Sequence, residues 1–196
     1  AFQNCDVAVV TNISADHIGL GGIDSMEQMA KVKQVVPETV FKHGYAILNA
    51  EDDLVYAMKD GLQCNIALFS MDENNKRIIE HCKNGGYAAV FENGYITIMK
   101  GTWKIRVVKV TEVPVTYGGK ATHNIMNCLP AVLSTYFWRN ISIEDIKLSL
   151  QTFVPSPAQT PGRLNMFQFK QFKFLVDFAH NPAGLELLCD FIGKMD

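Results

Sequence analysis

The sequence predicts an α/β protein with a mostly parallel β-sheet, helices around it and an antiparallel β insertion. Three observations lead to this fold class. Apolar, β-branched runs such as residues 7–10 end abruptly in polar residues, which is typical of buried strands in parallel sheets. Segments of helical character separate the first such runs, as crossover connections require. Residues 87–113 instead alternate β-rich runs with hairpin signals, which indicates antiparallel pairing.

The first helix is predicted over residues 25–36, after the glycine-rich turn that follows His17. Two overlapping pairs can form a capping box at its start: Asp24 with Glu27, or Ser25 with Gln28. Pro37 is expected to end or kink this helix. A second short helical stretch is then expected to reach Lys42, with Gly44 as its C-terminal stop.

Strands and helices alternate along the rest of the chain. Short strands are expected over 45–48 and 66–69, with helices ending at Met58 and covering 75–84. Hairpin turns are predicted at 92–94 and 101–102. Two more helices follow over 124–138 and 142–152, the second with Ser142 as N-cap.

A proline-rich linker over residues 155–162 marks the expected domain boundary. We therefore assign residues 1–157 to one domain and residues 158–196 to a second. The second domain is predicted to begin with strands over 164–169 and 172–178, followed by a helix that Pro182 opens.

The composition is that of an ordinary globular protein, with 196 residues, 48% hydrophobic and 19% charged. A net charge of -2 gives no basis for nucleic acid or an anionic membrane as a partner. Five scattered cysteines without C-x-x-C spacing favour a reducing, cytoplasmic compartment. Because elements begin directly after Ala1 and just before Asp196, we expect a fragment of a longer parent. Homo-oligomer formation by that parent stays open.

Polar side chains follow directly on the first strand, at Asn12, Asp16 and His17. Ligands of open α/β sheets bind beyond the carboxyl ends of the strands, so these residues are candidates for metal or phosphate chemistry. An ordinary strand exit is the alternative, because Asn and Asp are common turn residues.

Two further groups lie on predicted helices. Lys31 and Lys33 occupy the helix after His17, where a lysine is usually a solvated surface residue. Residues 123–127 (His-Asn-Ile-Met-Asn) open a helix, and such a start can cap itself or hold a nucleotide. Asparagine suits adenine because its amide offers both a donor and an acceptor.

The last two groups follow the linker. Arg163 comes after a stiff Pro161-Gly162 turn, and the planar fork of arginine suits phosphate oxygens. Pairing with a nearby carboxylate is the alternative for this residue. Residues 177–182 (Asp-Phe-Ala-His-Asn-Pro) again place polar groups beyond an apolar strand, where a carboxylate suits ribose hydroxyls.

In combination these groups resemble the motifs of the Mur ligase family. Thr11-Asn12-Ile13-x-x-Asp16-His17 is similar to its central-domain motif, and His123-Asn124-x-x-Asn127 to its adenine-side helix. Pro161-Gly162-Arg163 and Asp177-x-Ala179-His180-Asn181-Pro182 resemble motifs of its C-terminal domain. Further segments resemble the cyanophycin synthetase branch of this family: 6–12, 44–50, 91–95, 159–163 and 177–184.

The resemblance implies an ATP-dependent amide ligase that uses Mg²⁺. An amino acid and a peptide polymer would be its substrates, with arginine joined to aspartate side chains through an acyl phosphate. Residues 1–157 would be part of the central, ATP-binding domain, and residues 158–196 the beginning of the C-terminal domain.

The resemblance also assigns roles to single residues. His17 and Lys33 would bind the metal, Lys33 as the lysine that many members carbamylate, with Lys31 one register away. Asn127 would face adenine, Arg163 the phosphates and Asp177 the ribose. The expected catalytic residues are Lys33, Arg163 and His180. The expected nucleotide-binding residues are Asn12, Asn127, Arg163, Asp177 and Asn181.

The sequence also departs from the family pattern. A phosphate loop of the G-x-x-G-K-[ST] type does not occur in the 196 residues. Without its backbone amides and lysine, phosphate binding is crippled, so we expect this chain to be inactive by itself. Glu51 and Asp53 stand where related sequences tend to have Asp and Pro. Two alternatives stay open: another Mur-type ligase, acting on a muramyl peptide or folylpolyglutamate, and a non-catalytic remnant.

Overall fold

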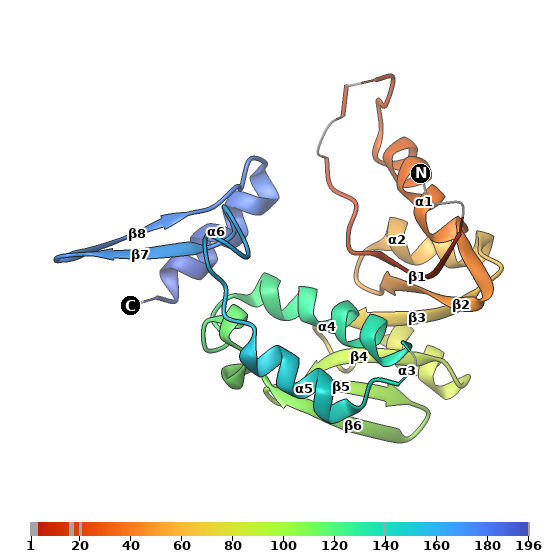
Figure 1. The fold of residues 1–196 in the computed structure, drawn as a ribbon. Helices are drawn as coiled ribbons and strands as arrows, with labels where there is room; N and C mark the ends of the chain where they lie inside the picture. Colours follow the sequence, from red (N-terminus) through yellow and green to blue (C-terminus); the bar gives the residue numbers. More distant parts are fainter. Residues whose placement is uncertain (1–3, 16–17, 20, 139, 196) are drawn as a thin grey trace.

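The computed structural model describes residues 4–15, 18–19, 21–138 and 140–195. Six strands form one sheet in the order β1-β2-β3-β4-β5-β6 (Figure 1). Its four parallel strands are β1 (Cys5–Val10), β2 (Val40–Asn49), β3 (Asn65–Ser70) and β4 (Tyr87–Glu92). Strands β5 (Tyr95–Lys100) and β6 (Trp103–Lys109) continue the sheet in antiparallel pairing. The predicted α/β class with an antiparallel insertion is confirmed.

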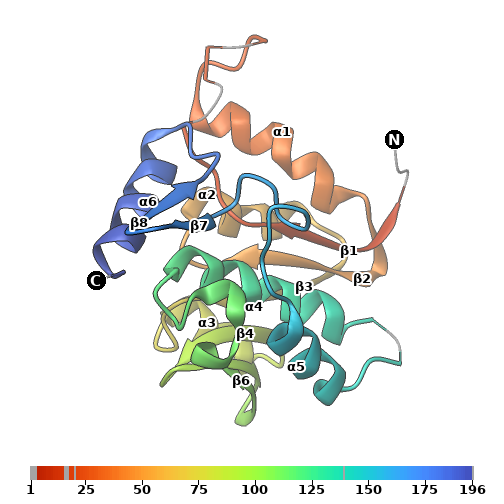
Figure 2. The ribbon, with the colours of Figure 1, turned by 60° about the vertical axis from the view of Figure 1, so that its left-hand side comes forward.

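Helices cover both faces of the sheet (Figures 1 and 2). One face carries α1 (Met26–Glu38), α2 (Asp53–Ala57) and α3 (Lys76–Lys83), which share a buried core with Leu48, Leu68 and Val90. The opposite face carries α4 (Thr122–Tyr136) and α5 (Ile143–Thr152), which pack on Ile47, Phe69 and Ile98. Alternate residues of β2, β3 and β4 therefore enter opposite cores, which explains their continuous apolar runs.

Short 3₁₀ segments connect several of these elements: η1 (Met58–Gly61), η2 (Val110–Glu112) and η3 (Pro114–Thr116). In the part of the chain that the structure describes, no helix is long and apolar enough to cross a membrane.

The segment after residue 160 forms a separate small layer. Strands β7 (Asn165–Phe169) and β8 (Phe172–Val176) pair antiparallel, and α6 (Pro182–Gly193) packs against them. Leu164 and Phe191 form a small core with Ala121, at the start of α4, so this layer rests on the amino end of that helix. The domain boundary at residue 157 stays a prediction.

One predicted element is wrong. The stretch up to Lys42 is not helical, because β2 begins at Val40 directly after α1. Gly44 lies inside this strand and does not end a helix. A Cβ at this position would lie 2.3 Å from the backbone oxygen of Asp6, so glycine permits the close approach of β1 and β2.

Several predicted ends are confirmed by local hydrogen bonds. Ser25 caps α1 by accepting from the backbone N–H of Gln28 at 3.2 Å. Ser142 forms a full capping box at the start of α5.

At the first predicted hairpin, Asn93 and Gly94 have φ angles of 49° and 83°, as a type I′ turn requires. Strand β8 ends at Val176, two residues earlier than predicted.

Candidate functional site

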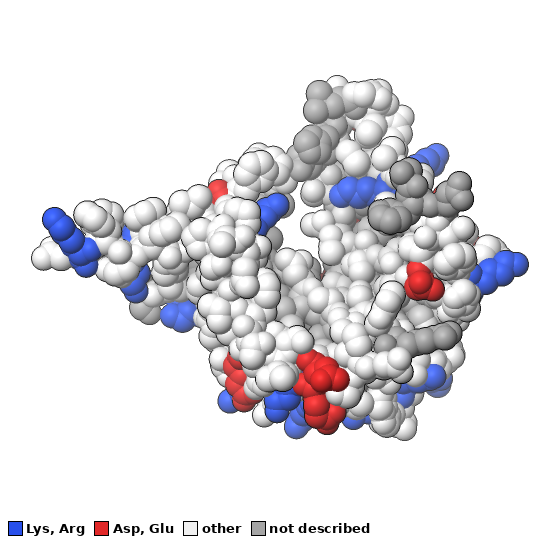
Figure 3. All heavy atoms as spheres, in the orientation of Figure 1, with Lys and Arg blue, Asp and Glu red and all other residues white. Residues whose placement is uncertain are grey.

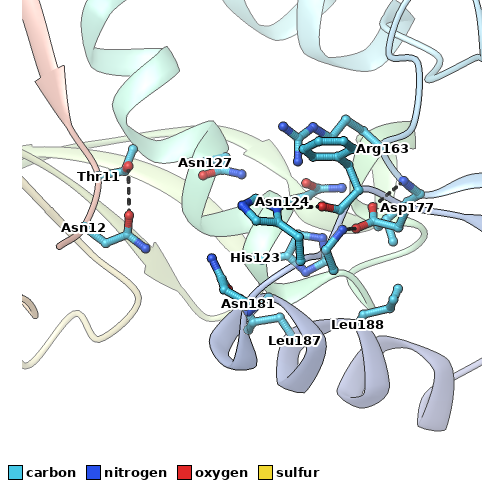
Figure 4. Close-up of a pocket in the computed structure, with 15 residues that line it drawn as sticks. Thr11, Asn12, His123, Asn124, Asn127, Arg163, Asp177, Asn181, Leu187 and Leu188 are labelled. Carbon is cyan, nitrogen blue, oxygen red and sulfur yellow. Dashed lines mark hydrogen bonds between the residues drawn. The ribbon is translucent and has the colours of Figure 1, made fainter. Parts of the chain in front are cut away.

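A cavity of about 480 Å³ opens between the carboxyl end of β1, the start of α4 and the layer formed by β7, β8 and α6. Figure 3 shows this face of the molecule hollowed, with basic side chains on both sides of the hollow. Six of the predicted site residues line the cavity: Asn12, Asn127, Arg163, Asp177, His180 and Asn181 (Figure 4). Residues far apart in the sequence thus meet at one place, as the motif analysis predicts.

The exit of β1 forms one wall of the cavity. Thr11 and Asn12 are exposed and line it, whereas Ile13 turns into the core beneath α1. The predicted metal ligand His17, and Asp16 before it, lie outside the described residues. Within those described, no group of three His, Cys, Asp or Glu side chains is arranged to hold a metal ion.

Lys33 reaches the same strand exit from α1. Its Nζ donates a hydrogen bond to the backbone oxygen of Asn12 at 3.1 Å, although Lys33 does not itself line the cavity. Lys31 is exposed on α1 and makes no hydrogen bond to any residue that the structure describes. The geometry therefore brings Lys33, and not Lys31, to the edge of the site.

The first two turns of α4 form a second wall. Asn124 is half-buried, and its Nδ2 donates to the backbone oxygen of Val115 at 2.7 Å, so this amide holds η3 in place. Asn127, one turn later, is exposed and points toward the cavity (Figure 4). Among the described residues its amide has no hydrogen-bond partner, so both its donor and its acceptor can meet a ligand.

An apolar groove of about 330 Å³ adjoins the cavity between α4 and α5. Asn124 and Asn127 line both spaces, and the groove continues past Cys128, Leu150 and Phe153. Burial raises the pKa of the Cys128 thiol to about 11, so this cysteine is an inert apolar wall at neutral pH.

Arg163 stands on the opposite side, in a turn with unusual backbone angles. Gly162 and Leu164 on either side of it have φ angles of 67° and 47°. The guanidinium lies over the ring of Phe178, with its Cζ 5.6 Å from the ring centroid. No carboxylate of the described residues forms an ion pair with it, so the alternative of a linker arginine held by an acid receives no support here.

Asp177 fixes the turn that carries Arg163. Its Oδ2 accepts from the backbone N–H of Leu164 and its Oδ1 from that of Ala179, each at 2.8 Å. Both carboxylate oxygens therefore hold the backbone of this turn, and Asp177 also lines the cavity.

The start of α6 completes the site. Asn181 is the N-cap of this helix, with its Oδ1 accepting from the backbone N–H of Gly184 at 2.8 Å. His180 precedes the cap, and its Nδ1 lies 2.9 Å from the backbone oxygen of Phe178. The amino end of a helix carries positive partial charge, which favours anionic groups.

Two histidines, His123 and His180, are among the residues that line the cavity. Burial lowers the pKa of His123, and the carboxylates of Asp177 and Asp190 oppose that shift. The imidazole of His123 is therefore neutral at pH 7. Positive charge in the cavity comes from Arg163 and from the start of α6.

Sequence reasoning missed two residues behind the site, Asn49 and Asp52. They lie on the exit of β2 and hold the backbone on both sides of Asn12, through Thr11 and Ile13. The local signal was an Asn at a strand end, followed three residues later by an Asp before a helix. That pattern predicts a helix cap, but it does not reveal contacts to a strand 38 residues away.

The family comparison finds the model described as "Mur ligase middle domain", which matches residues 1–135. The chain is 48% identical to a cyanophycin synthetase of Synechocystis sp. and 47% identical to one of Crocosphaera subtropica. Each alignment covers 98% of this chain and 22% of the relative. The chain therefore spans about a fifth of the length of these relatives.

More distant similarity reaches other ligases. The chain is 28% identical to a UDP-N-acetylmuramate–L-alanine ligase of Acetivibrio thermocellus, over 92% of this chain and 35% of that protein. A crystal structure of MurF from Acinetobacter baumannii superposes with a TM-score of 0.67 at 19% identity, over 97% of this chain and 38% of that one. This structural likeness concerns the fold alone.

Proposed function

Because the chain belongs to the Mur ligase family, we propose that it provides the nucleotide site of an ATP-dependent amide ligase of the cyanophycin synthetase type. The observation that carries the proposal is the cavity that gathers Asn12, Asn127, Arg163 and the start of α6. The higher sequence identity to cyanophycin synthetases than to the muramate–alanine ligase favours this branch over the other Mur-type ligases.

The adenine base is proposed to lie against Asn127, at the mouth of the apolar groove. The amide of Asn127, which has no hydrogen-bond partner among the described residues, can accept from the exocyclic amine of adenine and donate to a ring nitrogen. The groove between α4 and α5 supplies an apolar wall for the flat base. Asp177 would stand beside the ribose, in addition to its task in the Arg163 turn.

The phosphates are proposed to extend toward Arg163 and the amino end of α6. Arg163 has no competing carboxylate among the described residues, so its fork is available to phosphate oxygens. The backbone N–H groups at the start of α6 add positive partial charge, which attracts the negative phosphates. Mg²⁺, when bound, would neutralise charge on the transferred phosphoryl group, and His17 and the carbamylated form of Lys33 are the groups we expect to hold it.

The proposed reaction has two steps. A carboxylate oxygen of the acceptor, an aspartate side chain of the polymer, attacks the γ-phosphorus, and the bond to the β-phosphate oxygen breaks to release ADP. The amine of arginine then attacks the carbonyl carbon of the acyl phosphate, and the C–O bond breaks to release phosphate and leave an amide. The proton lost by the amine goes to a base or to water, and His180 is the candidate base beside the cavity.

The test uses the complete protein with ATP, Mg²⁺, an aspartate–arginine primer and arginine. We expect release of ADP that requires both primer and arginine. Release that instead requires UDP-N-acetylmuramate and L-alanine would favour the muramate branch. Absence of ADP release with every acceptor, together with no ATP binding by calorimetry, would favour the non-catalytic remnant.

A further inference from the structure

We propose that Asn49 and Asp52 are positioning residues that fix the exit of β1 at Asn12 and, through it, the ammonium group of Lys33. The residues that line the cavity do not include either of them. Both lie on the exit of the neighbouring strand β2. The positioning is a matter of geometry, while its effect on turnover rests on the proposed function.

Asn49 holds the first of two peptide groups. It is the last residue of β2 and only 4% exposed. Its Nδ2 donates to the backbone oxygen of Thr11 at 2.8 Å, and its Oδ1 accepts from the backbone N–H of Glu51 at 2.9 Å. Because both ends of the amide are engaged, its orientation is fixed, and the carbonyl of Thr11, which follows the last residue of β1, gains a hydrogen-bond partner.

Asp52 holds the second peptide group. Its Oδ1 accepts from the backbone N–H of Val55 at 3.0 Å and so caps α2. Its Oδ2 accepts from the backbone N–H of Ile13 at 2.7 Å. One carboxylate thus ties the start of a helix to the exit of β1.

The link to Lys33 follows from the planarity of the peptide bond. The N–H of Ile13 and the carbonyl of Asn12 belong to the same planar group and point in opposite directions. When Asp52 fixes the N–H, it also fixes the direction of the carbonyl. That carbonyl is the acceptor for Lys33 Nζ, at 3.1 Å.

Glu51 anchors the same loop on its other side. Its Oε1 accepts from the Ser70 hydroxyl at 2.7 Å and from the backbone N–H of Met71, at the end of β3. The loop between Asn49 and Asp52 is therefore attached to β1 on one side and to β3 on the other. Such a doubly anchored loop is suited to hold a site residue within a narrow range of positions.

The first test replaces Asp52 with serine in the complete protein. Serine keeps the cap on α2, because its hydroxyl also accepts from a backbone N–H, but it cannot hold Ile13 at the same time. Asn75→Ser is the matched control, since Asn75 caps α3 through the backbone N–H of Arg77 at 2.9 Å. The readout is the rate at which an amine-reactive acetylating reagent modifies Lys33 and Lys31 in carbonate-free buffer, measured by peptide mass spectrometry.

We expect Lys33 to react about threefold faster in Asp52→Ser, because its acceptor carbonyl is no longer fixed. Lys31 in both variants, and Lys33 in Asn75→Ser, should react at the wild-type rate. Asn49→Asp is the second variant and keeps the test valid if Asp52→Ser does not fold. It preserves volume and the bond from Glu51 but turns an oxygen toward the carbonyl of Thr11. It should raise the reactivity of Lys33 in the same way.

Turnover gives a second readout. In both variants kcat for primer-dependent ADP release should fall about tenfold, with KM for ATP within about twofold of wild type. Wild-type Lys33 reactivity in both folded variants would overturn the positioning role. If the wild-type protein shows no ligase activity, the proposed function fails, while the lysine reactivities still decide the positioning role.

Discussion

The carboxylate of Asp177 and the backbone N–H of Leu164 are joined by a hydrogen bond of 2.8 Å across the base of the Arg163 turn. Leu164 is buried and has a left-handed backbone conformation, which costs free energy in a non-glycine residue. The bond offsets part of that cost and connects the turn to the end of β8. The position of Arg163 beside the cavity therefore depends on Asp177.

We predict that Asp177→Asn loosens this turn. One amide oxygen can accept from Leu164 or from Ala179, but not from both in the present arrangement, and the amide NH₂ then faces a backbone donor. Loss of a partner for a buried N–H costs about 1–3 kcal/mol, so exchange of the Leu164 amide should accelerate at least about fivefold. Hydrogen-exchange mass spectrometry of the complete protein measures this.

Asp145→Asn is the control for that substitution. Asp145 also accepts from a backbone N–H, that of Ser142, but on the exposed start of α5. Its replacement should leave exchange at Leu164 unchanged. Equal protection of Leu164 in Asp177→Asn and wild type would mean that other contacts hold the turn.

Much of the fold is readable from the sequence because its determinants are local. Strand runs, the Asn93-Gly94 turn and the Ser142 cap each depend on a few neighbouring residues, and the structure has all three. The start of β2 at Val40 is not readable in this way. It depends on the pairing of Val40 with Cys5 of β1, a partner that the residues around Pro37 do not reveal.

The residues of the candidate site differ in the same way: some follow from local sequence patterns, and others depend on contacts between distant segments. Side chains at strand ends and helix starts are visible as polar groups after apolar runs, which is why six predicted residues meet in the cavity. Asn49 and Asp52 act through backbone atoms 38 and 39 residues away, and no local pattern encodes such a partner. Roles on the metal, on the ribose and on the phosphates stay predictions.

A second prediction concerns the base. Asn127→Leu should raise KM for ATP about tenfold in the complete protein, because the leucine fills the space but offers no donor or acceptor. The preference for ATP over GTP should narrow at the same time. Steady-state kinetics with both nucleotides measures this, and Asn84→Leu at the exposed end of α3 serves as the control. An unchanged preference would place the base elsewhere.

A third prediction concerns stability at acidic pH. Burial lowers the pKa of His81, against opposing hydrogen bonds to the backbone of Ile66 and Tyr87, and its Nε2 has no partner among the described residues. Below about pH 6.5 the unfolded chain therefore binds a proton that the folded chain does not. The contribution of neutral His81 to the free energy of unfolding is therefore fully present above that pH. As the pH falls below it, the free energy of unfolding decreases by at most about 1.4 kcal/mol per pH unit.

His81→Leu should remove this part of the pH dependence. Between pH 7.5 and 5.5, calorimetry should show a smaller fall in melting temperature for His81→Leu than for wild type. His43→Leu is the control, because His43 is exposed and pairs with Asp6 at 3.4 Å. A fall in His81→Leu as large as that of wild type would assign the acid sensitivity to other groups.

The last prediction concerns Arg163, the one cation among the residues that line the cavity. In the complete protein, Arg163→Lys replaces a planar fork that makes two parallel bonds to phosphate with a single point charge. If the contact strengthens as charge develops during transfer, kcat should fall more than KM for ATP rises. The expected loss is about 2–4 kcal/mol, as for removal of one preorganised donor from a catalytic site.

Arg106→Lys is the control, because Arg106 lies on β6 beside Glu92. Kinetics within about twofold of wild type in Arg163→Lys, with a lowered melting temperature, would make Arg163 a structural residue of the linker.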